Sequence, residues 1–443
     1  MSNASEHRWQ TCPEAADYLN QTIERLLEGN AFAQQIRQRL ATDTGTRLFD
    51  WIDHLAVCDD QQDTLVEIGF EEHDGVWRNS KALLPVVRFS DKQAIAIKVD
   101  SVIDFAAANE LRDSCDVHGA DSEQFMSATV AGETEFIAIE RHGYRGFVAA
   151  DNSPLQTKAA REFYARISQR TRDGDDGELK NFAQSSAMLK DVSQAIGMNW
   201  ACDIFFRAER EYWMSRNRAA QIQKGRQDKV GVGWANHDHH TYRCSREYFA
   251  PLVEVLELMG FQCRERFYAG EHAGWGAQVL EHPICGIVIF ADVDMSSDEV
   301  AGDFSHEGLE RRTDLGTVGL WCKLHGESFL QAGLHHLECQ FDFDVSREQL
   351  RGEGVETMAP FTDFPHLKQA FTQGETWAVD QKRLDQLVAA GSISEEQSAK
   401  FALDGAIGSH LEILERNDGY KGFNQSGISH IISKTDPRNE QDK

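Results

Sequence analysis

Three histidines lie close together in the segment Asn-His-Asp-His-His-Thr-Tyr-Arg, which ends at Arg243. In a strand alternate side chains point to one face, so His237, His239 and Thr241 share a face and His240 lies on the other. Arg243 then stands on the first face, roughly 13 Å along the strand from His239. A metal-bound histidine with a guanidinium nearby would suit an anionic substrate. The alternative is that these histidines are packed or solvent-facing.

Two predicted strands further along the chain add candidate ligands. His336 lies in a strand expected over 333–341, and Glu412 lies in a strand expected over 408–416. Two histidines and one carboxylate suit a borderline divalent metal and leave three octahedral positions open, as in non-haem Fe(II) oxygenases. The spacing alone does not show that these distant strands converge.

Neighbouring residues compete for the same roles, and the competitors are His237, His240, His335 and Glu415. Strand alternation places His240 and His335 away from the site, and it places Glu415 opposite Glu412. This interpretation favours the ligand set His239, His336 and Glu412.

An internal repeat links the two halves of the chain. The segment 137–147, IAIERHGYRGF, matches 412–423, EILERNDGYKGF, with one residue inserted. Such self-similarity indicates that both halves are built from related β-rich modules. The copies differ at the candidate site, because Ile137 stands where the second copy has Glu412. No histidine of comparable context is apparent in the first half, whose nearest analogous strand is 94–99. The first half therefore looks structural.

The chain of 443 residues is long enough for two or three domains. Residues 1–152 are expected to form N-terminal helices and a degenerate α+β module, with helical character over 13–40 and again over 48–55. Residues 153–230 read as a helical connector, and residues 231–443 as a module pair that carries the metal site. The connector arginines are interspersed with glutamates and are expected on a solvated face; they are Arg207, Arg210, Arg216, Arg218 and Arg226.

Charge and composition narrow the class of protein. A net charge of −27 argues against nucleic-acid binding and against docking on anionic membranes. Residues 1–10 lack the features of a signal peptide, and the longest apolar run, 284–291, is too short to span a bilayer. Nine scattered cysteines without a CxxC pair fit reduced thiols. We expect a cytoplasmic monomer or homodimer.

Residues 231–430 resemble the vicinal oxygen chelate superfamily, whose βαβββ modules place metal ligands on strands. The sequence DHHTYR, ending at Arg243, is similar to the first ligand strand of the 2-oxoadipate dioxygenase/decarboxylase family. The sequences GLHHL over 333–337 and LEILER over 411–416, with Gly-Phe at 422–423, are similar to later ligand strands of 4-hydroxyphenylpyruvate dioxygenase. The resemblance implies an α+β fold of duplicated modules forming open β-barrels, with added N-terminal and connector helices.

The same resemblance implies a chemistry. Fe(II), or alternatively Zn, Mn, Ni or Co, would be held by His239, His336 and Glu412. A 2-oxo acid and O₂ would be the substrates, with oxidative decarboxylation and hydroxylation. Arg243 would hold a second substrate carboxylate, and the pocket mouth would be formed by Tyr420, Lys421, Phe423 and Asn424.

Other functions are compatible with the same residues. The nearest alternative is another metal-dependent enzyme of the superfamily, an isomerase, a lyase or an extradiol-type dioxygenase. A zinc hydrolase is a different class, suggested by the HxH at 237–239. A non-catalytic binding protein with packed histidines is the third.

Overall fold

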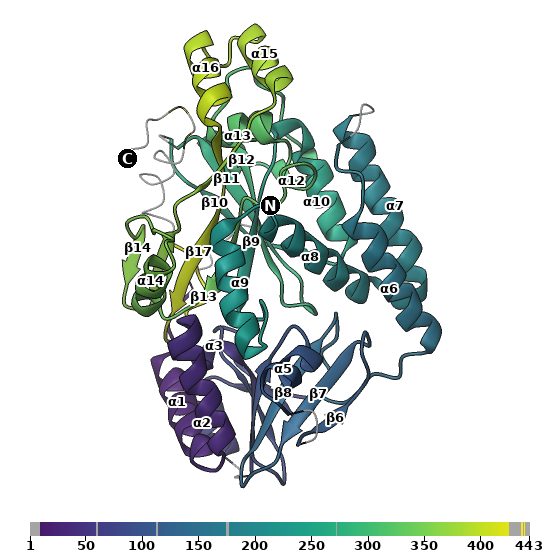
Figure 1. The fold of residues 1–443 in the computed structure, drawn as a ribbon, viewed down its shortest axis with the longest axis vertical. Helices are drawn as coiled ribbons and strands as arrows, with labels where there is room; N and C mark the ends of the chain where they lie inside the picture. Colours follow the sequence, from purple (N-terminus) through teal and green to yellow (C-terminus); the bar gives the residue numbers. More distant parts are fainter. Residues whose placement is uncertain are drawn as a thin grey trace.

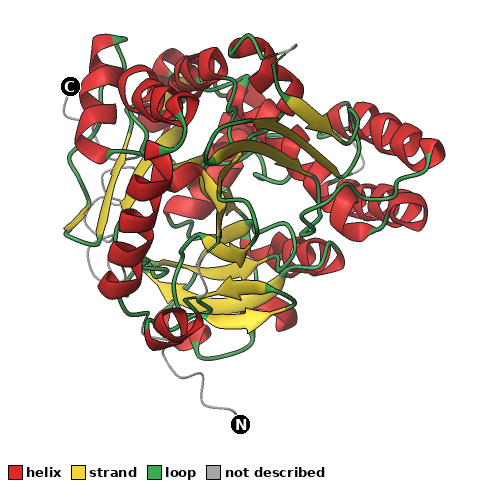
Figure 2. Cartoon of the chain, turned by 90° about the horizontal axis from the view of Figure 1, so that it is seen from below, coloured by secondary structure: helices red, strands yellow, loops and turns green. Residues whose placement is uncertain are grey.

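A computed structural model describes residues 9–58, 61–111, 114–173, 177–271, 273–424, 436 and 438. It contains two curled β-sheets, with helices packed around and between them (Figures 1 and 2). The first sheet is built from residues 52–141 and the second from residues 237–416. No helix in the described part of the chain is long and apolar enough to cross a bilayer.

Two βαβββ units form the first sheet. The first unit is β1 (Ile52–Val57), α4 (Gln62–Glu67), β2 (Glu71–His73), β3 (Val76–Arg78) and β4 (Val86–Phe89). The second unit is β5 (Ala94–Lys98), α5 (Val102–Ala108), β6 (Asp116–His118), β7 (Phe125–Val130) and β8 (Glu135–Arg141). The strand order is β2-β3-β4-β1-β5-β8-β7-β6, so the two units meet where β1 pairs antiparallel with β5.

The second sheet repeats this plan. Its first unit is β9 (His237–Arg243), η2 (Arg246–Tyr248), α10 (Phe249–Leu258), β10 (Gln262–Tyr268), β11 (Trp275–Glu281) and β12 (Val288–Asp294). Its second unit is β13 (His336–Gln340), α14 (Phe343–Gly352), β14 (Thr362–Phe364), β15 (Leu367–Phe371), β16 (Glu375–Trp377) and β17 (Ala406–Arg416). The order β10-β11-β12-β9-β13-β17-β15-β14 matches that of the first sheet, and β16 is an additional strand that pairs with β17. The predicted fold of duplicated vicinal-oxygen-chelate-type modules is therefore confirmed.

The duplication extends to single side chains. Arg141 at the end of β8 pairs with Asp53 on β1, and Arg416 at the end of β17 pairs with Asp238 on β9. His54 follows Asp53 as His239 follows Asp238, so His54 is a counterpart of His239. The expectation that the first half has no such histidine is wrong.

The histidine was missed because residues 48–55 were expected to be helical. Only Leu48–Trp51 forms a helical turn, α3, and strand β1 begins at Ile52. A short apolar run does not distinguish a buried strand from a helix by its periodicity.

The remaining helices surround the sheets. The predicted N-terminal helix is divided at Gly29, where α1 ends, and Asn30 caps α2 by accepting a hydrogen bond from the Ala33 amide. The helices before the second sheet are α1 (Pro13–Glu28), α2 (Ala31–Arg39), η1 (Leu40–Thr44), α6 (Pro154–Ser168), α7 (Glu178–Ile196), α8 (Met198–Met214) and α9 (Arg218–Val230). Those within it are α11 (Ser297–Val300), α12 (Phe304–Glu307), α13 (Thr317–His325), α15 (Gln381–Ala389) and α16 (Glu395–Asp404).

Helices α6 to α8 pack against the second sheet and share its apolar core (Figure 1). Glu209 on α8 forms buried ion pairs with two arginines where these helices pack. It accepts hydrogen bonds from Arg170 at 3.0 Å and Arg172 at 2.5 Å, and both arginines also donate to backbone carbonyls of Phe329 and Leu330. The Tyr242 hydroxyl on β9 also donates to Glu209, at 3.4 Å, so this buried cluster connects the helices to the second sheet.

We predict that Glu209→Gln lowers the free energy of unfolding by about 3–5 kcal/mol, because two buried guanidinium groups lose their carboxylate. Equilibrium denaturation in urea measures this. Glu211→Gln on the same helix is the matched control, because its carboxylate pairs with Arg207 at the surface and removing it should cost under about 1 kcal/mol. Equal losses in both variants would contradict this account.

Candidate metal centre

Three neighbouring strands of the second sheet bring the predicted ligands together. β13 lies between β9 and β17, and its register sets Glu338 directly opposite His239 on one side and Glu412 on the other. His336 is two residues before Glu338 and so points to the same face. Ligand atoms of His239, His336 and Glu412 all lie within 4.8 Å of one another, and all three residues are buried.

Direct contacts hold the group in place. His336 Nε2 lies 2.9 Å from Glu412 Oε2, and His239 Nδ1 contacts Glu338 Oε2. Gln369 on β15 donates to both carboxylates, at 2.9 Å to Glu338 and 3.1 Å to Glu412. With Nδ1 of His239 turned to Glu338, its Nε2 faces away from that carboxylate and is free to bind a metal, as in carboxylate–histidine–metal arrangements.

The charges of the group favour a bound cation. Burial, and then the nearby Glu338 carboxylate, raise the pKa of Glu412 well above its usual range. Burial lowers the pKa of His336 well below its usual range, so its imidazole is neutral. Burial also lowers the pKa of His239, but Glu338 and Asp238 outweigh it and raise that pKa to about 9. A divalent cation would compensate these carboxylates, and the donor set of two imidazoles and one carboxylate fits such an ion.

A cavity of about 60 Å³ adjoins these residues. Arg243 lies in its wall and is buried, and its Nε and Nη1 atoms have no hydrogen-bond partner among the described residues. Trp321 stacks 5.6 Å from the guanidinium carbon. Much of the remaining wall is aromatic, formed by Phe267, Trp275, Phe290, Phe361, Phe371 and Phe423. A buried guanidinium with N–H groups left to donate has the chemistry to bind a carboxylate.

Asp292, opposite Arg243 on the neighbouring strand, is a residue that the sequence did not single out. Burial raises the pKa of Asp292 to about 7, although Arg243 lowers it in part. Its Oδ1 atom has no hydrogen-bond partner among the described residues. Asp292 can therefore exchange a proton near neutral pH beside the cation that would hold a substrate.

The other predicted site residues lie in different places. Phe423 lines the cavity, with its ring 5.3 Å from that of His239. Tyr420 packs against His366 instead, and Lys421 pairs with Glu281 at 3.1 Å. Asn424 donates a hydrogen bond to Thr362 and is not part of the cavity wall.

Two expectations from strand alternation are wrong. His335 also lines the cavity, because β13 begins only at His336 and the alternation does not extend to the residue before it. His237 does not share a face with His239, because a register shift between β9 and β13 falls between them. Its ring lies 5.2 Å from that of His240 instead. Glu415 faces away as predicted, accepting from the Phe343 amide.

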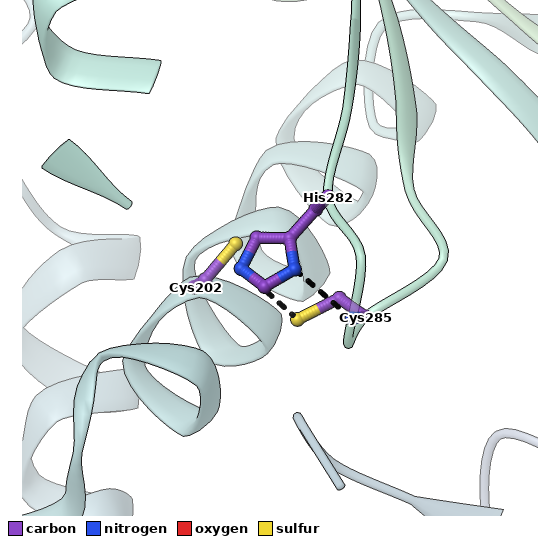
Figure 3. A group of neighbouring side chains, drawn as sticks. All are labelled: Cys202, His282 and Cys285. Carbon is purple, nitrogen blue, oxygen red and sulfur yellow. Dashed lines mark hydrogen bonds between the residues drawn. The ribbon is translucent and has the colours of Figure 1, made fainter. Parts of the chain in front are cut away.

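A second group of donors, Cys202, His282 and Cys285, lies where α8 meets the turn after β11 (Figure 3). His282 Nδ1 accepts from the amides of Ile284 and Cys285, each at 3.1 Å, so the proton of a neutral ring is on Nε2. That nitrogen donates to the Met259 carbonyl at 2.9 Å. With both nitrogens engaged, His282 is a poor metal ligand.

No family model and no curated protein matches the chain. Among solved structures, a mutant of 4-hydroxymandelate synthase from Streptomyces coelicolor is 13% identical, with 77% of this chain and 98% of that chain covered and a TM-score of 0.32. Methylmalonyl-CoA epimerase from Mycobacterium tuberculosis is 13% identical, covering 41% and 88%, with a TM-score of 0.24. The Mn(II)-bound glyoxalase from Novosphingobium aromaticivorans is 8% identical, covering 83% and 82%, with a TM-score of 0.19. Likenesses this weak add nothing to the strand order described above.

We predict that His336→Ala and Glu412→Ala each abolish metal binding, because each removes a buried donor. Elemental analysis of protein purified without oxygen measures the metal content per chain. Glu415→Ala is the matched control on the same strand, and it should keep its metal because its carboxylate faces away from the group. Full metal occupancy in Glu412→Ala would contradict the assignment.

A pH dependence follows from Asp292. Above a pH of about 7 its carboxylate ionises beside Arg243 and competes with a substrate carboxylate for the guanidinium, whereas below that pH it is neutral. We predict that the KM for an anionic substrate rises as the pH increases through about 7. Steady-state kinetics of Asp292→Asn should lack this rise, and an unchanged rise in that variant would exclude Asp292 as its cause.

Proposed function

We propose that this chain is a non-haem Fe(II)-dependent dioxygenase that acts on a 2-oxo acid, with oxidative decarboxylation and hydroxylation. The observation that carries this proposal is the convergence of His239, His336 and Glu412 from three strands beside one buried cavity. Two histidines and one carboxylate would leave adjacent coordination positions on a metal ion for a bidentate 2-oxo acid and for O₂. Fe(II) bound there would supply the activation of O₂, and the chain supplies orientation and exclusion of water.

Arg243 would bind the distal carboxylate of the substrate. Its Nε and Nη1 atoms have no hydrogen-bond partner among the described residues, so the guanidinium has N–H groups left to donate to a carboxylate, and burial strengthens the ion pair. Because the cavity is only about 60 Å³, the buried part of the substrate must be small. We therefore favour a short 2-oxo diacid over a large aromatic substrate.

Glu338 and Gln369 would act as positioning residues. Glu338 contacts His239 Nδ1 and orients its ring. The side-chain amide of Gln369 donates to the carboxylates of Glu338 and Glu412 and so orients both. Outer partners of this kind orient metal ligands and tune their basicity.

A metal-dependent isomerase or lyase is a second candidate, and Asp292 is the observation that favours it. A carboxyl group with a pKa of about 7 in the same cavity wall could remove and return a proton next to a substrate carbonyl. Such an enzyme would need no O₂ and would turn over under nitrogen.

Oxygen uptake separates the two functions. Protein loaded with Fe(II) without oxygen is mixed with a panel of 2-oxo monoacids and diacids, and O₂ consumption and CO₂ release are recorded together. The dioxygenase should consume one O₂ for each CO₂, with diacids preferred. Turnover of a carbonyl substrate without O₂ uptake would contradict the dioxygenase and support the isomerase or lyase.

We predict that Arg243→Lys keeps its iron but raises the KM for the preferred diacid by about tenfold or more, because an ammonium group lacks the bidentate fork. Steady-state O₂ consumption measures this. Arg311→Lys, at an exposed position, is the control and should leave the KM unchanged. An unchanged KM in Arg243→Lys would exclude Arg243 as the carboxylate anchor.

A further inference from the structure

A cleft of about 670 Å³ lies between the first sheet, helix α8 and the segment before β9. It shares no lining residue with the cavity of the candidate metal centre. Lys98 at the end of β5, Arg210 on α8, Arg78 at the end of β3 and Arg145 in the loop after β8 all line it. The volume is that of a site for a small metabolite.

These four cations, which we call the cleft cations, lack carboxylate partners. Among the described residues, none of Arg78, Lys98, Arg145 and Arg210 has an ion pair within 4.0 Å. Arg210, expected on a solvated face, is only 8% exposed, and its Nη1 atom lies 3.4 Å from His240 Nε2. The chain carries a net charge of −27, so a group of unpaired cations is not a consequence of its composition.

Most carboxylates in the cleft wall are already paired with a cation, although His142 is shared between Asp203 and Glu140. These pairs are Asp53 with Arg141, Asp203 with His142, and Glu211 with Arg207. Asp100 accepts a hydrogen bond from the Trp234 amide at 2.6 Å, and burial raises its pKa, which weakens its charge. Asp104 is the remaining acid in the wall. The unpaired charge in the cleft is therefore positive.

Two of the cleft cations are disfavoured in their charged form by their surroundings. Burial, followed by repulsion from Arg78, lowers the pKa of Arg145, and burial lowers the pKa of Lys98. Arg210 is buried, Lys98 and Arg78 are half-buried and Arg145 is exposed, so the cost of desolvation differs among them, and a bound anion would offset it where the cation is withdrawn from water. Arginine forks and a lysine together suit carboxylate or phosphate oxygens.

We propose that this cleft binds an organic anion that carries two or more carboxylate or phosphate groups. The site is separate from the proposed catalytic centre and does not depend on the function proposed for it. Several cations spread around one cleft require a ligand with more than one charged group.

Calorimetric titration of the full-length protein tests the proposal, with tricarballylate as the polycarboxylate probe and fructose 1,6-bisphosphate as the phosphate probe. At least one probe should bind, and the tighter one identifies the chemical class. Arg78→Gln combined with Arg145→Gln should weaken binding by about tenfold or more. Arg311→Gln, which removes an exposed arginine elsewhere, should leave binding unchanged.

A second variant separates the cleft from the metal centre. Because Arg243 is proposed as an anion site, a probe bound there would lose affinity in Arg243→Gln but not in the Arg78→Gln, Arg145→Gln double variant. Absence of binding by both probes, or equal affinity in the wild-type protein and the double variant, would overturn the proposal.

Cys285 provides an independent readout because its side chain lines the cleft. Its hydrogen bond with Cys202 lowers the pKa of Cys285 to about 7, so it should react readily with iodoacetamide. Bound anion should slow this alkylation severalfold, as followed by mass spectrometry. Cys263 is the internal control, because it lies outside the cleft and burial raises its pKa to about 11. Undiminished alkylation of Cys285 at saturating probe would also contradict binding in the cleft.

Discussion

The register of β13 between β9 and β17 is the constraint on which the site depends. It sets Glu338 between His239 and Glu412, and it turns His336 to the same face. Three carboxylates, including Asp238, are thereby gathered in one buried place, and Arg416 neutralises only Asp238. Burial, and then repulsion from Glu338, raise the pKa of Glu412, and the arrangement is best stabilised by a cation among the ligands. A one-residue slip of β13 would send these side chains to the other face.

The first sheet has the same strand arrangement, ion pair and histidine contact, but it lacks the two carboxylates of the candidate metal centre. It keeps the Asp53–Arg141 pair and the contact of His54 with Phe147, which correspond to Asp238–Arg416 and His239 with Phe423. In register with His54, however, stand Ala96 and Ile137, in place of Glu338 and Glu412. The shared arrangement is thus a structural feature of the fold, and the candidate chemistry comes from polar residues at a few positions of the second copy. The two sheets also enclose a cleft between them, which gives the molecule a second place for a ligand.

The sequence predicted much of this because the relevant patterns are local. Strand alternation favoured His239, His336 and Glu412 over their neighbours. The repeat of Glu-Arg and Gly-Tyr-x-Gly-Phe predicted that the two sheets are built from related modules. The sequence also contains the signal for His54, since Asp-His recurs at 53–54 within β1 and at 238–239 within β9, but the apolar residues around His54 favour a helix by their pattern.

Other features depend on three-dimensional packing, which the sequence does not show. A register shift separates His237 from His239, and the start of β13 places His335 in the cavity wall. Arg210 looked solvated because its neighbours are charged, yet α8 packs that face against the second sheet. The raised pKa of Asp292 arises from burial, and the apolar run 284–291 before it indicates a buried strand but not that Asp292 lines the cavity beside Arg243.

The location of a bound metal tests the central claim most directly. The protein is loaded with Fe(II) in the absence of oxygen and crystallised, and diffraction data are collected at the iron absorption edge. The bound ion then appears as an anomalous difference peak. The account predicts one peak within coordinating distance of His239, His336 and Glu412. A peak at Asp238 and Glu338 away from His336, a peak at the group of Cys202 and Cys285, or no peak in the second sheet would contradict it.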